Sequence, residues 1–160
     1  MLLLRECMPY TRHQSFIKIK HGCFQVIQVP GNQRIQLFNT PVINGDLNLI
    51  DINTTDGIPV VIGIPWCGTS GIYTSRSYPL GGITFIKKDI TDQVRRIDGD
   101  DAVLSIAQRM ISPCWNTRLL ENNLAASEKI AAGITVFRLC CTKNPSSAFL
   151  MKEEIDNEYH

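Results

Sequence analysis

The sequence predicts an α/β domain in which a mixed β-sheet is followed by C-terminal helices. Apolar and polar residues alternate from Ser15 to Gly82, as is typical of half-buried strands. Helical periodicity begins after residue 98, and a β-branched run returns between two helical segments. The 160 residues, 44% of them hydrophobic, have the usual size and apolar content of one domain. We therefore expect residues 1–160 to form a single α/β unit.

Turn residues separate the strands that we expect in the first half. His21-Gly22 lies between two short apolar runs and predicts a hairpin. Asp56-Gly57 precedes a run rich in β-branched residues and predicts a second hairpin, which is the strongest local signal in the chain. Gly81-Gly82 is expected to introduce the last strand of this half, which ends at Lys87-Lys88. The strands are predicted at 16–20, 23–29, 47–52, 58–64 and 83–86.

Helices dominate the second half of the predicted fold. Apolar residues spaced three and four positions apart indicate a first helix, which Pro113 ends, and a second helix, which Gly133 ends as a C-cap. A strand at 134–140 and a short terminal helix follow. The predicted N-caps are Asp98 or Asp100, then Asn116 or Thr117, then Ser146 or Ser147. Val103, Ile106, Ala107, Met110 and Ile111 fall on one face of the first helix, and Leu119, Leu120, Leu124, Ile130 and Ala131 mark the second.

Composition and charge exclude several classes of protein. Sixteen Lys and Arg oppose fifteen Asp and Glu, the net charge is +1, and no long run of one sign occurs. These values argue against nucleic acid or a membrane surface as a partner. Six cysteines include no CxxC pair, so we expect reduced, mostly buried thiols rather than a zinc site. The apolar start is too short for a secretory signal, and the expected location is cytoplasmic.

The segment from Gly63 to Gly71 is the most unusual in the chain. Its glycines allow close backbone approach, so that amide groups and the hydroxyls of Thr69 or Ser70 are suited to an anion. The alternative is a structural connection in which Trp66 anchors the core. Cys67 lacks a nearby histidine in sequence that would activate it as a nucleophile.

A second polar segment, Asn44-Gly45-Asp46, interrupts an apolar stretch. A carboxylate at the edge of a strand can ligate Mg²⁺ or accept a proton from a hydroxyl, whereas Asn-Gly alone is typical of a β-turn. The sequence alone does not decide between a functional carboxylate and a β-turn at this segment. Arg76 follows the glycine segment and has the forked donors that clamp phosphate, while Arg95 and Arg96 are expected to be solvated before the first helix.

Three stretches together resemble a known family. They are Asn39-Thr40-Pro41-Val42-Ile43-Asn44-Gly45-Asp46-Leu47-Asn48-Leu49, Gly63-Ile64-Pro65-Trp66-Cys67-Gly68-Thr69-Ser70-Gly71-Ile72-Tyr73 and Tyr78-Pro79-Leu80-Gly81-Gly82-Ile83. In this order they resemble the kinase-like proteins related to HPr kinase/phosphorylase and the phosphoenolpyruvate carboxykinase nucleotide-binding fold. The similarity continues through 111–116 and 136–139, and so covers residues 39–141, with 1–38 divergent or truncated.

The resemblance implies a carboxykinase-like P-loop kinase fold that binds ATP and Mg²⁺. It implies phosphoryl transfer to a protein serine or to a small hydroxyl compound as acceptor. Asp46 would be the catalytic residue and the metal ligand. The nucleotide- or phosphate-binding residues that it implies are Asn44, Gly68, Thr69, Ser70, Gly71 and Arg76.

The chain departs from this family at its phosphate loop. A Walker A motif requires Gly-Lys followed by Ser or Thr, and the sequence contains no Gly-Lys dipeptide. Segment 29–34, where that loop is expected, offers Arg34 as its only cation. Either the true start lies upstream or the N-terminal region has diverged. The alternative function is therefore a non-catalytic nucleotide- or protein-binding module, and a third expectation is self-association through an uncovered strand edge.

Overall fold

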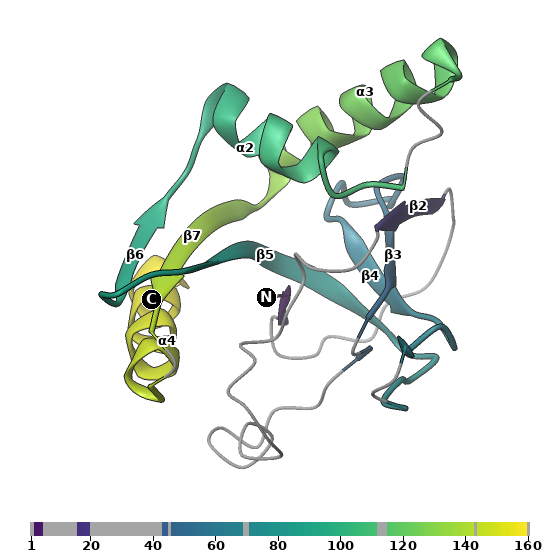
Figure 1. The fold of residues 1–160 in the computed structure, drawn as a ribbon. Coiled ribbons are helices and arrows are strands. Elements are labelled where there is room, and N and C mark those ends of the chain that lie inside the picture. Colours follow the sequence, from purple (N-terminus) through teal and green to yellow (C-terminus); the bar gives the residue numbers. More distant parts are fainter. Residues whose placement is uncertain are drawn as a thin grey trace.

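The computed structural model in Figure 1 describes residues 2–4, 16–19, 43–44, 46–68, 71–111, 115–142 and 144–159. It confirms an α/β architecture with a mixed sheet and C-terminal helices. The strands and helices, in chain order, are β1 (Leu2–Leu4), β2 (Phe16–Ile19), β3 (Asn48–Asp51), β4 (Val60–Gly63), β5 (Ser77–Lys88), β6 (Gln93–Arg96), α2 (Gly99–Ala107), α3 (Thr117–Gly133), β7 (Thr135–Cys141) and α4 (Ser146–Tyr159).

The long strand β5 joins the two halves of the sheet. The strand order is β2-β3-β4-β5-β7-β6, and β1 pairs with β5 outside this path. The pairing of β5 with β7 is parallel, and the other pairings are antiparallel. Residues 77–79 of β5 pair with β4, and residues 82–88 pair with β7. The sequence between the parallel strands supplies the crossover that such a pair requires, and it contains α2 and α3.

The predicted hairpin at Asp56-Gly57 is confirmed, with a wider loop than the turn signal implies. Asp51 pairs with Val60, so residues 52–59 connect β3 to β4. Gly57 has a φ of +74°, and its N–H donates to the carbonyl of Thr54 at 3.2 Å. The β2 strand is also confirmed and pairs with β3. The turn at His21-Gly22 and the strand predicted at 23–29 lie outside the described residues.

The prediction that Gly81-Gly82 precedes a strand is wrong, because both glycines lie inside β5. Gly82 pairs with Leu3 of β1 on one edge and with Thr135 of β7 on the other. Ladder hydrogen bonds on both edges outweigh the conformational entropy that glycine loses in a strand. The strand therefore begins at Ser77, earlier than its sequence suggests.

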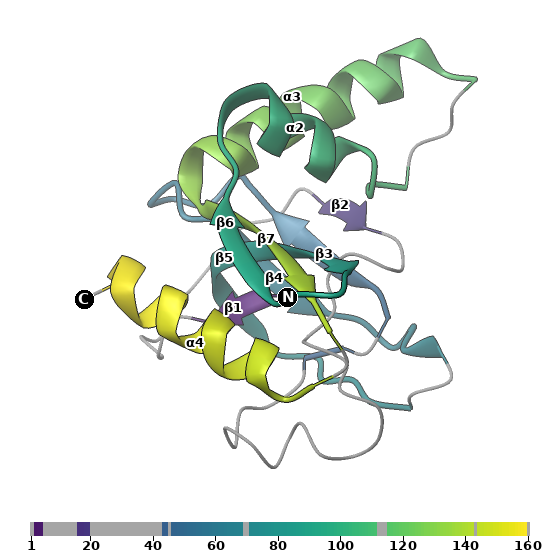
Figure 2. The ribbon, with the colours of Figure 1, turned by 60° about the vertical axis from the view of Figure 1, so that its left-hand side comes forward.

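Helices cover both faces of the sheet around β5 and β7. Figures 1 and 2 show α2 and α3 on one face and α4 on the other. One core cluster joins Ile83 and Val136 of the sheet to Ile106 of α2 and Ile130 of α3. A second cluster places Phe137, Leu139, Ala148 and Met151 between β7 and α4. Successive residues of β7 thus pack on opposite faces, as strand geometry requires.

The helix α2 is shorter than its apolar periodicity predicts. It ends at Ala107, before Met110 and Ile111, and Met110 is buried from the segment that follows. Pro113 lies outside the described residues. Asp98 occupies the N-cap position, but it makes no capping hydrogen bond and instead accepts from Arg96 Nε at 2.8 Å.

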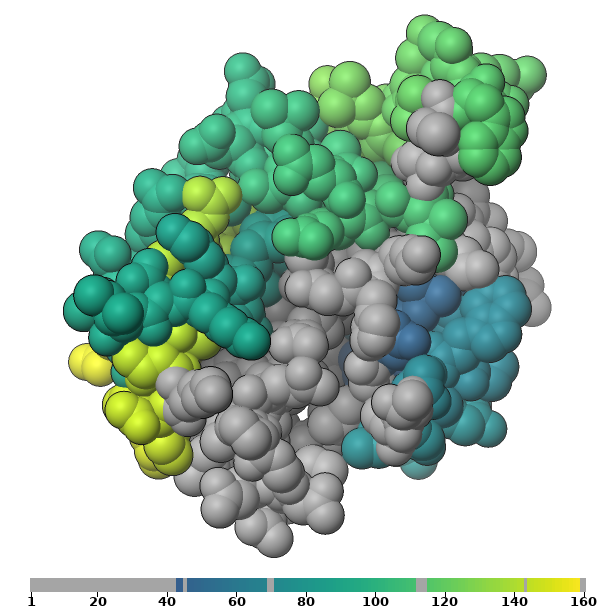
Figure 3. Space-filling view, viewed as in Figure 1, coloured from purple at the N-terminus to yellow at the C-terminus, as the bar shows by residue number. Residues whose placement is uncertain are grey.

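The helix α3 has the predicted N-cap and an exposed N-terminal half. Asn116 Oδ1 accepts from the N–H of Leu119 at 3.1 Å. Leu119, Leu120 and Leu124, which indicate this helix in the sequence, are each at least 40% exposed. This end of α3 projects at the upper right of Figures 1 and 3. Gly133 is the last helical residue rather than the C-cap, which is Ile134.

The terminal helix α4 is confirmed, but its predicted caps are not. Ser146 Oγ donates to Asp92 Oδ2 at 2.5 Å, and Ser147 Oγ donates to the carbonyl of Asn144 at 3.0 Å. The strand at 134–140 is confirmed as β7. Among the helices in the described ranges, none has the length and apolar character needed to cross a membrane.

Candidate functional site

A buried asparagine organises the glycine segment. Asn44 is 3% exposed, and its side chain makes hydrogen bonds on both sides. Its Nδ2 donates to the carbonyls of Ile64 and of Trp66, the latter at 3.3 Å. Its Oδ1 accepts from the N–H groups of Asp46 at 2.7 Å and Leu47 at 3.0 Å. The amide therefore fixes the conformation of its own turn and ties that turn to segment 64–66.

Backbone hydrogen bonds hold a third segment beside these two. Asn44 forms a β-bridge with Tyr73, and the N–H of Thr74 donates to the carbonyl of Ile43 at 2.8 Å. The N–H of Gly63 donates to the carbonyl of Arg76 at 3.2 Å. The segments 43–47, 63–68 and 73–76, far apart in sequence, thus meet at one place.

The carboxylate of Asp46 lies against Gly68. A Cβ atom built on Gly68 would stand 2.5 Å from Asp46 Oδ2 and 3.2 Å from its Cγ. Gly68 also has a φ of +57°, which L side chains rarely adopt. The positive φ favours glycine at this position, and any larger residue would also displace the Asp46 carboxylate. This contact joins the acidic segment to the glycine segment, and we call it the Asp46–Gly68 site.

The other predicted site residues lie near it to different degrees. The side chain of Arg76 is exposed, and its backbone N–H donates to Thr74 Oγ1 at 3.3 Å. Gly71 is exposed with a φ of +65°, and a Cβ there would meet nothing within 4 Å. Thr69 and Ser70 lie outside the described residues. The structure therefore brings Asn44, Asp46 and Gly68 together, with Arg76 attached through its backbone.

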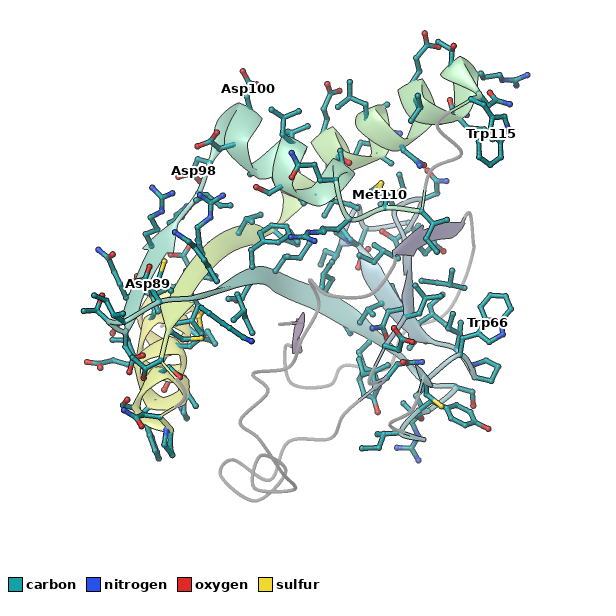
Figure 4. All side chains as sticks on the ribbon, viewed as in Figure 1. Trp66, Asp89, Asp98, Asp100, Met110 and Trp115 are labelled. Carbon is teal, nitrogen blue, oxygen red and sulfur yellow. The ribbon has the colours of Figure 1, made fainter. Side chains whose placement is uncertain are left out.

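The structure also decides between functional and structural interpretations of Trp66 and Asn44. Trp66 is not a core anchor, because its side chain is 61% exposed, and Figure 4 shows it at the surface. The turn interpretation of Asn44 is confirmed, since its Oδ1 accepts from the backbone two and three residues later. Cys67 is a half-buried reduced thiol. The turn and the site are compatible, because the asparagine that forms the turn also positions Asp46.

The donor set at this site fits magnesium through one carboxylate. Mg²⁺ is commonly held by one or two carboxylates together with phosphate oxygens and water, and Asp46 supplies one such group. Asn44 has all four of its hydrogen-bonding positions engaged within the protein, so it is a positioning residue rather than a ligand-binding one. In the described part of the chain, no three His, Cys, Asp or Glu side chains are grouped so that they could hold a metal ion.

Two buried polar side chains of β3, one at each end of the strand, were not predicted. Asn48 is 3% exposed and pairs with Gly63, and its Oδ1 has no hydrogen-bond partner among the described residues. Asp51, 4% exposed, accepts from the N–H of Asn53 at 2.9 Å through Oδ1. Asn48 and Asp51 are three positions apart and so point to opposite faces of β3, and polar residues in a predicted strand are normally assigned to solvent. Only the pairing of β3 between β2 and β4 shows that these two are buried.

Comparisons with known proteins matched no family model, no curated protein and no solved structure.

Proposed function

We propose that the chain is a kinase-like protein that transfers a phosphoryl group from ATP to a hydroxyl, with Asp46 at the reacting end of the site. The acceptor is a protein serine or a small hydroxyl compound. The proposal includes the carboxykinase-like P-loop kinase fold that the motifs suggest. A single observation supports it above others: the acidic segment and the glycine segment, which the motif resemblance assigns to one site, are in contact through Asp46 and Gly68.

The chemistry assigned to Asp46 follows from its charge and position. A carboxylate beside the phosphate-approach segment can hold Mg²⁺ or accept the proton of the attacking hydroxyl. When bound, Mg²⁺ would neutralise charge on the phosphate oxygens. Gly68 leaves room for the carboxylate, and Asn44 holds the backbone on both sides of it. Arg76, at the adjacent strand end, is the cation available to the phosphates.

The negative charge of Asp46 affects how a phosphate ligand can bind at this site. Its negative charge lies against the backbone that the phosphate would approach, and two like charges repel strongly near a protein surface. A cation between them converts this repulsion into attraction. Nucleotide binding at this site is therefore expected to require magnesium.

Calorimetry with ATP tests this expectation directly. The wild-type chain should bind ATP with Mg²⁺ and bind it at least about tenfold more weakly with EDTA. Asp46→Asn, which keeps the shape of the side chain, should weaken the Mg²⁺-dependent binding and improve the metal-free binding. Asp100→Asn is the matched control, because Asp100 is exposed on α2 and distant from Trp66 in Figure 4. Equal binding of ATP by wild type and Asp46→Asn under both conditions would remove Asp46 from the site.

Phosphoryl transfer requires a second measurement. Labelled ATP and Mg²⁺ should give labelled acceptor, and Asp46→Ala should abolish the label while Asp100→Ala keeps it. Transfer that continues unchanged in Asp46→Ala would exclude Asp46 from the mechanism.

The second candidate is a non-catalytic nucleotide- or protein-binding module. The engagement of Asn44 favours it, because an amide expected to contact phosphate is used within the protein instead. This candidate predicts Mg²⁺-dependent binding of ATP, or binding of a protein, without labelled acceptor or released phosphate. The transfer assay therefore separates the two candidates.

A further inference from the structure

Two arginines face each other across the edge of the sheet. In the antiparallel pairing of β6 with β7, Arg95 is the direct partner of Arg138. Side chains at such positions have Cβ atoms about 4.5–5.5 Å apart, and like charges directly opposite each other are destabilising. Arg95 and Arg96 are exposed before the first helix, as expected, and they lie in the paired strand β6.

Both arginines lie on the face of the sheet that α2 covers. The neighbours of Arg95 define the opposite face, since Val94 packs in the α4 cluster and Arg96 Nη1 bonds Glu158 of α4 at 2.8 Å. Strand alternation then places Arg95 on the α2 face. Arg138 is half-buried, and its Nη2 donates to Ser105 Oγ of α2 at 3.4 Å.

A third cation joins them from β5. Arg138 pairs with Phe85, and Lys87, two residues further along β5, pairs with Cys140. Lys87 therefore lies on the same face as Arg138, diagonally across the parallel pair. We call Lys87, Arg95 and Arg138 the basic cluster. Its three residues come from three adjacent strands, with the thiol of Cys140 on the same face beside Arg138 and Lys87.

The charges of the basic cluster are only partly neutralised. Arg96, on the other face, has Asp98 and Glu158 at 2.8 Å. Within the described ranges, the carboxylate that Lys87 meets is that of Asp89, at 3.9 Å. No carboxylate of the described residues lies within ion-pair distance of Arg95 or Arg138. Asp100 and Asp101, in the first turn of α2, do not pair with either arginine.

We propose that the basic cluster binds a phosphate-type oxyanion, either inorganic phosphate or the phosphoryl group of a small phosphate ester. The forked donors of two opposed arginines match phosphate oxygens, and an anion between them replaces their repulsion with two charge-assisted interactions. The exposed side chains of Lys87 and Arg95 leave the cluster accessible, and the β6 region is at the molecular surface in Figure 3. This site is independent of the Asp46–Gly68 site, because β5 and β7 separate β6 from β4 in the sheet.

Calorimetry with inorganic phosphate and with phenyl phosphate, at constant ionic strength, tests the cluster and distinguishes its two sources of ligand. At least one of the two should bind the wild-type chain, and Arg95→Gln should weaken that binding about tenfold, the loss expected for one charge-assisted interaction. Arg118→Gln is the control, since Arg118 is an exposed arginine on the projecting end of α3. Equal losses in Arg95→Gln and Arg118→Gln, or no binding of either probe, would overturn the proposal.

A chemical readout at Cys140 locates the anion. Phosphate bound beside this thiol should slow its alkylation several-fold, as measured by peptide-resolved mass spectrometry, while Cys67 near the other site should react at an unchanged rate. Arg95→Gln should lose this protection. An alkylation rate of Cys140 that is independent of phosphate in the wild-type chain would place any bound anion elsewhere and overturn the assignment.

Discussion

The attachment of α4 to the sheet depends on Asp92, and its removal has a calculable cost. Asp92 lies between β5 and β6, and its Oδ1 accepts from the N–H of Thr142 at 2.6 Å. Its Oδ2 accepts from Ser146 Oγ at 2.5 Å, at the first residue of α4. Asp92→Ala deletes both interactions and so separates the β5–β6 connection from the start of the helix.

The expected destabilisation follows from these two hydrogen bonds. Hydrogen bonds to charged groups contribute about 1.5–3 kcal/mol each, and the half-exposed position of Asp92 reduces this to about 1 kcal/mol each. The sum, about 2 kcal/mol, corresponds to a fall in Tm of about 4–8 °C for a chain of this length. Ser146→Ala removes one interaction and should cause about half of that fall.

The pH dependence has a definite sign. The hydrogen bond from Ser146, followed by that from Thr142, lowers the pKa of Asp92 below its ordinary value of 3.8. A lowered pKa in the folded state contributes stability that is fully present above the unfolded value and is lost as pH falls through the folded value. The Tm difference between wild type and Asp92→Ala should therefore be constant from neutral pH to about pH 4 and become smaller below it.

Thermal denaturation followed by circular dichroism between pH 3 and pH 7 measures both effects. Asp89→Asn is the control within the same connection, because Asp89 makes a 3.9 Å surface ion pair with Lys87 and accepts from the adjacent N–H of Ile90 at 2.8 Å, a bond that Asn can keep. A Tm of Asp92→Ala within about 1 °C of wild type at neutral pH would refute the role of the tether. A Tm difference between wild type and Asp92→Ala that stays constant down to pH 3 would refute the contribution of the Asp92 charge to stability.

Three further predictions concern the site and the sheet edges. In urea denaturation, Gly68→Ala should lower the free energy of unfolding by about 1–3 kcal/mol more than Gly71→Ala does. Both positions have a positive φ, but only Gly68 lies against the Asp46 carboxylate. Equal losses would contradict that contact. Asn44→Ala should cost about 3 kcal/mol in the same assay, since it leaves several buried backbone groups unpaired, and a loss under about 1 kcal/mol would show that they find other partners. Self-association through an uncovered strand edge should appear in light scattering as a mass above 18.0 kDa, and a monomer at high concentration would contradict it.

The parts of the fold that depend on local pattern could be predicted from the sequence. The β3–β4 hairpin, β7 and the Asn116 cap each rest on residues within a few positions of one another. The failures involve partners that are distant in sequence. Gly81-Gly82 is in a strand because β1 and β7 pair on both sides of it. Leu119, Leu120 and Leu124 indicate the helix α3, but a local pattern does not show that their side chains remain exposed.

The two proposed sites could likewise be predicted from the sequence only as far as local pattern allows. Asp46 could be singled out because its local segment is unusual, although its contact with Gly68 could not be foreseen. The basic cluster left no signal, since Lys87, Arg95 and Arg138 are dispersed in a nearly neutral chain and only strand register brings them together. A balanced net charge therefore argues against a polyanion-binding surface but not against a site for one phosphate.

The opposite charges of these sites make them separable in one titration. A phosphate without metal is repelled by the Asp46 carboxylate and attracted by Arg95 and Arg138, whereas magnesium favours approach to Asp46 and is not needed at the arginines. With EDTA, ATP or phenyl phosphate should therefore bind only at the basic cluster and protect Cys140. Added Mg²⁺ should create a second binding event for ATP that Asp46→Asn removes and Arg95→Gln retains. If one substitution abolished both binding events, the phosphate groups would share a single site, and the proposal of two separate sites would be wrong.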